Sequence, residues 1–126
     1  MFSTIYSGAV CGLQAYLIRV EVDLAGGLPA FLMVGYLGSE VRESRERVCV
    51  AMKNSGFQIP PGHITVNLAP ADRRKDGTAF DLPIAIGLLQ DMELLKEDAV
   101  KDTLFLGELG LNGEIKKAKG VLPIVR

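Results

Sequence analysis

Apolar and polar residues alternate along several short stretches of the chain, which predicts strands with one face against a core. The clearest stretch is residues 15–24, where Ile18, Val20 and Val22 interleave with polar side chains such as Arg19. The other predicted strands are residues 3–10, 63–68 and 103–106, together with residues 30–36, which are strongly apolar. Because the links between the first three strands are short, we expect these strands to form an antiparallel sheet.

A helical period predicts a first helix at residues 39–55, in which Val41, Ser44 and Val48 share one face. The rest of this helix is charged over two turns. Its charged residues form a candidate interface with another protomer or domain: Arg42, Glu43, Arg45, Glu46 and Arg47. The alternative is a solvated face, because opposite charges recur here at a spacing of four residues.

A second helix is predicted at residues 81–95. Asp81 is the expected N-cap, with Pro83 in the first turn, and a capping box from Thr78 to Asp81 is the alternative start. A hairpin at residues 107–115 and the beginning of a third helix complete the chain. Strands therefore precede and separate the helices, which predicts an α+β fold with helices on one face of a mixed sheet.

Length and composition indicate an ordinary globular domain that spans residues 1–126. The 126 residues carry a formal net charge of -1, which argues against bulk electrostatic binding to nucleic acid or a membrane. Cys11 and Cys49 stand apart within apolar stretches, as buried thiols do. We expect a cytoplasmic location, because the start lacks a signal peptide and no apolar run would span a membrane. The chain ends within an apolar segment, so we expect it to continue in a longer protein.

Common catalytic motifs are missing from the sequence. It contains one histidine, His63, no nucleotide-binding P-loop and no cluster of histidines and cysteines at metal-ligand spacing. A lone histidine at the start of a strand is typical of a surface residue rather than of a base or ligand. We therefore expect no catalytic residue, no metal and no cofactor in this chain.

The charged loop at residues 69–80 is the best candidate binding site, because its basic residues come just before a helix N-terminus. The candidate DNA or anion contacts are Arg73, Arg74, Lys75, Gly77 and Thr78. Asp72 and Asp76 partly neutralise the loop, so the alternative is a solvated loop that binds nothing.

Several long motifs in this order resemble one known family. They are residues 27–31 (GLPAF), 34–35 (VG), 43–48 (ESRERV), 53–57 (KNSGF), 64–72 (ITVNLAPAD), 75–77 (KDG) and 80–85 (FDLPIA). The chain resembles the N-terminal domain of the magnesium-chelatase-like AAA+ ATPases of the YifB/ComM type over nearly its whole length. It departs from the family at residues 36–39 (YLGS), where a Leu-Pro-Asp-like turn is typical.

The resemblance implies a fold like the Lon protease domain and the second domain of ribosomal small-subunit protein five, with a left-handed crossover. It also implies that the chain continues into an AAA+ module that binds ATP and Mg²⁺ and forms a hexamer. Similar proteins drive branch migration of DNA during transformation. The implied partners are the chain's own AAA+ module, further protomers and DNA, and no membrane.

A Lon-like fold raises the question of a Ser-Lys catalytic dyad. Compared with Lon-type proteases, Ala79 stands where the nucleophile should be and Leu122 where the lysine should be. Thr78 is one position early and carries a hydroxyl. We therefore expect a non-catalytic accessory domain that assists ring assembly or contacts DNA. The alternatives are a cryptic peptidase that uses Thr78 and a purely structural spacer.

Overall fold

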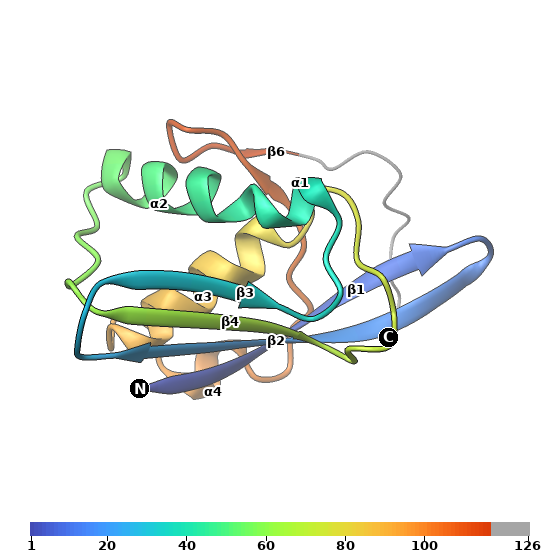
Figure 1. Ribbon diagram of the computed structural model, residues 1–126, viewed down its shortest axis with the longest axis horizontal. Coiled ribbons are helices and arrows are strands. Elements are labelled where there is room, and N and C mark those ends of the chain that lie inside the picture. The colour runs from blue at the N-terminus through green and yellow to red at the C-terminus, as the bar shows by residue number, and fades with distance from the viewer. Residues whose placement is uncertain (117–126) are drawn as a thin grey trace.

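The computed structural model describes residues 1–116 and contains one mixed four-stranded sheet (Figure 1). Its strands lie in the order β1-β2-β4-β3. They are β1 (Phe2–Cys11), β2 (Gln14–Ala25), β3 (Ala30–Val34) and β4 (His63–Ala69). β1, β2 and β4 fall on predicted strands of the sequence and β3 on the predicted apolar strand, so these strands were predicted correctly and the α+β fold class is confirmed.

The pairing of β3 differs from the prediction of an antiparallel sheet of the first three strands. β1 and β2 form an antiparallel hairpin, but β4 inserts next to β2, and β3 pairs with β4 in parallel at the edge of the sheet. The connection from β3 to β4 runs through helices, which is how parallel neighbours are joined. The prediction was wrong because it took the short link between β2 and β3 as evidence of pairing. β3 follows β2 in sequence but does not pair with it.

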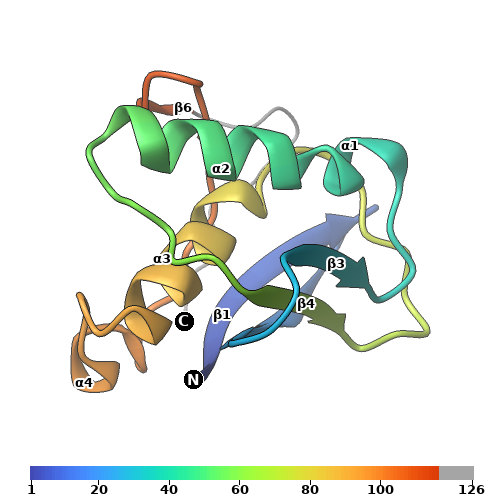
Figure 2. The same ribbon diagram turned by 60° about the vertical axis from the view of Figure 1, so that its left-hand side comes forward.

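The helices pack on one face of the sheet, as predicted (Figure 2). The first predicted helix is divided into α1 (Ser39–Arg42) and α2 (Ser44–Asn54), and the residue between them keeps right-handed helical angles. α3 (Asp81–Asp91) ends earlier than predicted, and Glu93 just after it has a positive φ of 64°. The short α4 (Glu97–Val100) follows and has no counterpart in the prediction.

The core lies between the sheet and the two longer helices. Val20, Val22 and Val66 are fully buried, and burying such a side chain contributes about 1.5–3 kcal/mol. Gly87 lets α3 approach the sheet closely, because a Cβ at this position would lie 2.5 Å from Cγ2 of Val22. The close packing of α3 fixes the two ends of this helix relative to β1 and β2.

The segment after α4 forms less strand than predicted. Leu104 makes a single parallel bridge to Tyr6, and the backbone N–H of Phe105 donates to the Tyr6 carbonyl at 2.9 Å. The predicted hairpin is present as β5 (Glu108–Leu109) and β6 (Ile115–Lys116). The predicted third helix lies outside the described residues.

Candidate functional site

The basic loop between β4 and α3 does not present its three basic side chains alike. Arg73 and Arg74 are exposed, whereas Lys75 is fully buried. The guanidinium of Arg73 stacks on the ring of Tyr16 at 3.7 Å from the centroid, and Arg74 Nε lies 2.9 Å from Oδ1 of Asp76. Only the two arginines are therefore accessible to a ligand, and whether they contact DNA stays a prediction.

Lys75 was expected to contact DNA or an anion, but its side chain does not lie at the surface of the loop. Its Nζ donates hydrogen bonds to the carbonyl oxygens of Gly35, at 2.6 Å, and of Pro70. Burial lowers the pKa of Lys75, and nearby Asp72 partly opposes this effect. The side chain thus ties the loop to the end of β3, and it is not available to an external phosphate.

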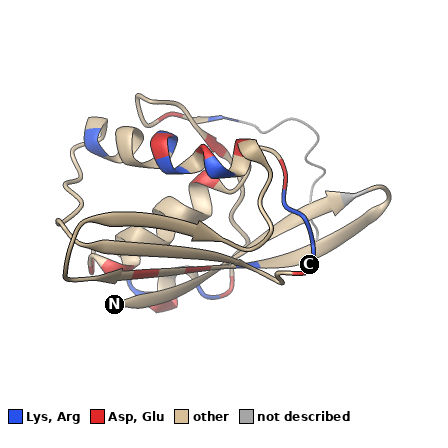
Figure 3. Cartoon of the chain, viewed as in Figure 1, with Lys and Arg blue, Asp and Glu red and all other residues tan. Residues whose placement is uncertain are grey.

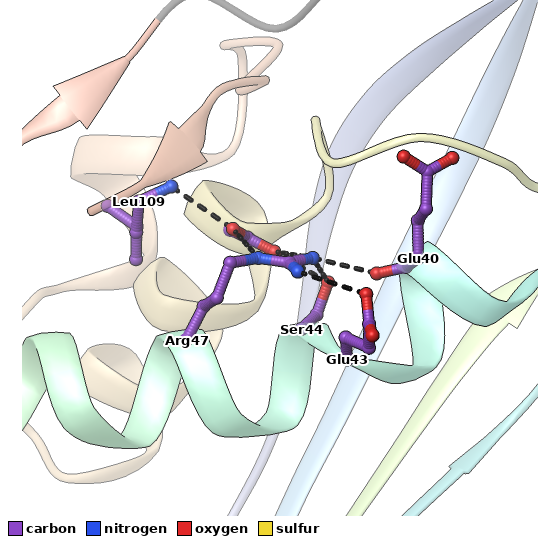
Figure 4. Close-up of polar contacts among 6 residues, drawn as sticks. Glu40, Glu43, Ser44, Arg47 and Leu109 are labelled. Carbon is purple, nitrogen blue, oxygen red and sulfur yellow. Dashed lines mark hydrogen bonds and ion pairs between the residues drawn. The ribbon is translucent and has the colours of Figure 1, made fainter. Parts of the chain in front are cut away.

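Four groups converge on the carboxylate of Asp81, the first residue of α3 (Figure 4). Ser44 Oγ donates to Oδ1 at 2.6 Å, and Arg47 Nε donates to Oδ2 at 2.6 Å. Arg47 Nη2 lies 3.1 Å from Oδ1, and the backbone N–H of Leu109 donates to Oδ2 at 3.1 Å. The donors come from α2 and β5, so one carboxylate joins three elements.

The network compensates for the cost of burying a charge. Asp81 is fully buried, and Arg47 retains only 18% of its side-chain exposure. Burial disfavours the charge on Arg47, but the hydrogen bond to Asp81 and the charges of Asp81, Glu108 and Glu43 together raise the pKa of Arg47. A buried ion pair is tolerated when both charges are hydrogen-bonded. Removing one partner leaves the other charge buried and unpaired, which strongly lowers the stability of the fold.

The network corrects two sequence-based expectations. The N-cap position of α3 is Phe80, and no side chain caps this helix, so neither Asp81 nor a Thr78 capping box starts it. Arg47 does pair with Glu43, at 3.8 Å, but it is turned toward α3 rather than fully solvated. Ser44 was the available signal, because a polar residue within an apolar helical stripe needs a buried partner.

The positions compared with the Lon-type dyad carry no nucleophile–base pair within the described residues. Ala79 is buried, and its carbonyl accepts a hydrogen bond from Gly107 N–H at 2.8 Å. Thr78 is partly exposed, and Gly77 before it has a positive φ of 85°, which suits glycine. Leu122 lies outside the described residues. Position 79 thus has no side-chain oxygen that could act as a nucleophile.

The other members of the predicted helical interface are exposed. Arg42, Glu43 and Glu46 face solvent, and Arg45 pairs with Glu46 at 3.3 Å. A surface ion pair of this kind contributes about 0–1 kcal/mol to the free energy of folding, so it adds little to the stability of the fold. Whether this face contacts another protomer stays a prediction.

Residues 1–116 can be compared with metal-binding and membrane-spanning proteins in two respects. No three histidine, cysteine, aspartate or glutamate side chains in this range come together as metal ligands. None of the helices in the same range is long and apolar enough to cross a membrane. The candidate site is therefore the polar network at Asp81 together with the two exposed arginines of the loop.

Comparison with known proteins gives a consistent relationship. The family described as subunit ChlI of Mg-chelatase matches residues 20–126. The competence protein ComM of Haemophilus influenzae is 44% identical over 121 residues, which are 96% of this chain and 24% of ComM. The uncharacterized protein YifB of Escherichia coli is 42% identical over 95% of the chain, and the uncharacterized protein Mb2921c of Mycobacterium bovis is 36% identical over 95%.

These relatives are much longer than the region that they share with this chain. The chain spans about a quarter, 24%, of the length of each of the three. The match to the family covers most of the chain and includes β4, the basic loop and α3. The chain belongs to the family of the ChlI subunit of Mg-chelatase, and within it to the ComM/YifB type.

Proposed function

We propose that the chain is a non-catalytic accessory module of a ComM/YifB-type protein and that it supports assembly of that protein's ring. The observation that carries the proposal is the network in which Ser44, Arg47 and Leu109 all bind the carboxylate of Asp81. This network locks α2, α3 and β5 together at the place where a Lon-type enzyme would open its catalytic helix. A rigid junction is compatible with a module that supports assembly, and Ala79 has no side-chain oxygen that could act as a nucleophile.

The remainder of the proposal rests on the relatives. They extend over about four times the length that the chain covers, since the chain spans 24% of ComM and of YifB. The family resemblance implies that an AAA+ module, with ATP and Mg²⁺, occupies the rest and forms a hexamer. In this proposal, the module acts in the cytoplasm and contributes binding surfaces, while the AAA+ part carries out all of the chemistry.

Assembly of a full-length protein that carries this module tests the proposal. Sedimentation velocity in the presence of ATP should show a smaller fraction of rings for Asp81→Ala, because the junction loses its shared acceptor. Thr78→Ala removes the hydroxyl beside position 79 and should assemble like the wild type. Ser44→Ala provides a milder break in case Asp81→Ala fails to fold. Full assembly of a folded variant with a broken network would contradict the proposal.

A second candidate function is contact with DNA through Arg73 and Arg74. It is favoured by their exposure and by the stacking of Arg73 on Tyr16, which holds a cation at the surface. A salt series of DNA binding by the full-length protein tests this role, because each phosphate contact steepens the salt dependence. The double variant Arg73→Ala/Arg74→Ala should flatten the slope, and an unchanged slope would exclude the contact.

A further inference from the structure

The edge strand β3 leaves one row of backbone groups unpaired. It is the last strand in the sheet order, and no other strand within residues 1–116 lies beyond it. The N–H of Ala30 donates to the Gly62 carbonyl on the β4 side, at 3.2 Å. Because the backbone groups of successive residues point to opposite sides of a strand, Phe31 and Met33 present theirs at the free edge.

This edge lacks the features by which edge strands usually avoid pairing. β3 has the sequence AFLMV, with no charged residue and no proline. On the open face of the sheet, Leu32 is 51% exposed and Val34 is 49% exposed. The edge therefore offers both backbone hydrogen bonds and apolar contact area to an added strand.

A basic stripe on α1 and α2 lies on the side of these helices away from α3. Arg47 and Asn54 mark the side toward α3 and β5, through their bonds to Asp81 and to the Leu111 carbonyl. Positions three and four apart along the other side carry the stripe, which consists of Arg42, Arg45, Cys49 and Lys53. α3 packs on β1 and β2, so the side of α2 away from α3 lies toward the half of the sheet that ends at β3 (Figures 1 and 2). Figure 3 shows basic and acidic residues along α1 and α2.

The stripe has a surplus of positive charge. Arg42, Arg45 and Lys53 are exposed, Glu46 pairs with Arg45 at 3.3 Å, and Glu43 pairs with Arg47 instead. A strand added to β3 would turn alternate side chains toward the stripe and toward Leu32 and Val34. The charge of the stripe and the exposed apolar side chains of Leu32 and Val34 thus favour an added strand in which acidic and apolar side chains alternate.

We infer that the β3 edge and the basic stripe form a docking site for an extended, acidic segment of a partner protein, in which acidic and apolar residues alternate. The acidic side chains lie under Arg42, Arg45 and Lys53, and the apolar ones extend the open face beside Leu32. This site is independent of the proposed role in ring assembly. A second copy of the chain is a poor occupant, because two-fold pairing of β3 edges would bring two basic stripes together.

Fluorescence anisotropy with labelled synthetic peptides tests the site on the 126-residue chain. A peptide of alternating Glu and Val should bind, and its Lys and Val counterpart should not. The triple variant Arg42→Glu/Arg45→Glu/Lys53→Glu should weaken binding about tenfold or more, since three favourable charge contacts become repulsive. Amide hydrogen exchange should show that the peptide protects Phe31 and Met33.

A matched control keeps the test independent of overall charge. The variant Arg19→Glu/Lys96→Glu/Lys101→Glu changes the net charge equally at exposed positions away from the site and should bind like the wild type. Equal weakening by both triple variants would overturn the inference, and so would binding without protection of Phe31 and Met33. Binding of single-stranded DNA without any binding of the Glu and Val peptide would overturn it as well.

Discussion

Helix α3 carries a buried aspartate at each end, and the two carboxylates differ in their hydrogen-bond partners. Asp81 at the start is fully buried and accepts hydrogen bonds from Ser44, Arg47 and Leu109. Asp91 at the end is 3% exposed, and neither of its oxygens has a hydrogen-bond partner among the described residues. The same side chain is therefore a structural acceptor in one place and a destabilising group in the other.

The position on the helix adds to this difference. A helix N-terminus favours negative charge and a C-terminus disfavours it, so the macrodipole supports Asp81 and opposes Asp91. Burial raises the pKa of Asp91 to about 7, against smaller opposing effects of Ser3 and the N-terminal amine. The hydroxyl of Ser3 donates to the Gly87 carbonyl instead, at 3.0 Å. Partners, rather than burial alone, decide what a buried carboxylate costs.

The largest expected effect follows from removing the satisfied carboxylate. Asp81→Ala should lower the free energy of unfolding by about 3–5 kcal/mol, because it strands the charge of Arg47 and the N–H of Leu109. Urea denaturation followed by circular dichroism measures this change. Arg47→Ala combined with Asp81→Ala should cost less than the sum of the single changes, since the pair acts as a unit. Additive losses would mean that the two residues do not stabilise the fold together.

A smaller effect of the opposite sign is expected at the other end of α3. An aspartate in an unfolded chain titrates near pH 3.9, whereas burial raises the pKa of Asp91 to about 7. The folded state therefore holds the proton more tightly, and its stability falls as the pH rises from about 4 to about 7. Above this window the penalty is complete. Asp91→Asn should thus raise the free energy of unfolding at pH 8 by about 1–3 kcal/mol.

Thermal unfolding across a pH series checks the behaviour of Asp91. The wild type and Asp91→Asn should have similar midpoints near pH 4 and should diverge as the pH rises. Asp23→Asn should weaken the pH dependence slightly, because the charge of Asp23 contributes to the raised pKa of Asp91. A variant that tracks the wild type at every pH would show that Asp91 is ionised at no cost.

The smallest expected effect concerns one donor of the Asp81 network. Ser44→Ala removes a hydrogen bond of 2.6 Å but leaves Arg47 and Leu109 in place. The free energy of unfolding should fall by about 1–2 kcal/mol, which is typical of a bond to a charged group. Chemical denaturation measures the loss, and Ser39→Ala, at an exposed position of α1, is the matched control. A loss as large as that of Asp81→Ala would mean that the hydrogen bond from Ser44, rather than the ion pair with Arg47, provides most of the stability of the network.

The strands and the two longer helices could be predicted from the sequence, because their burial follows periods of two and 3.6. The position of β3 could not, since strand order depends on contacts between distant residues. The sequence KDG places Lys75 in a charged loop, where a lysine is normally solvated. Its burial depends on the carbonyls of Gly35 and Pro70, which only the folded chain brings to it.

The candidate site was predicted only in part for a related reason. An aspartate before Pro83 has the same sequence signature whether it caps the helix or accepts bonds from another helix. The i,i+4 pattern correctly places Glu43 near Arg47, but the pattern holds no information about α3. Asp91 follows an apolar run without any sequence signal that its carboxylate lacks partners.

We propose that the junction before α3 is a structural lock and not a peptidase site. Incubation of the chain with unfolded casein, with a hydroxyl-directed covalent probe in parallel, tests this claim most directly. The wild type and Thr78→Ala should both leave casein intact and the probe unreacted, because Ala79 has no oxygen and Lys75 is bound to backbone carbonyls. Cleavage or labelling by the wild type that disappears in Thr78→Ala would contradict the account.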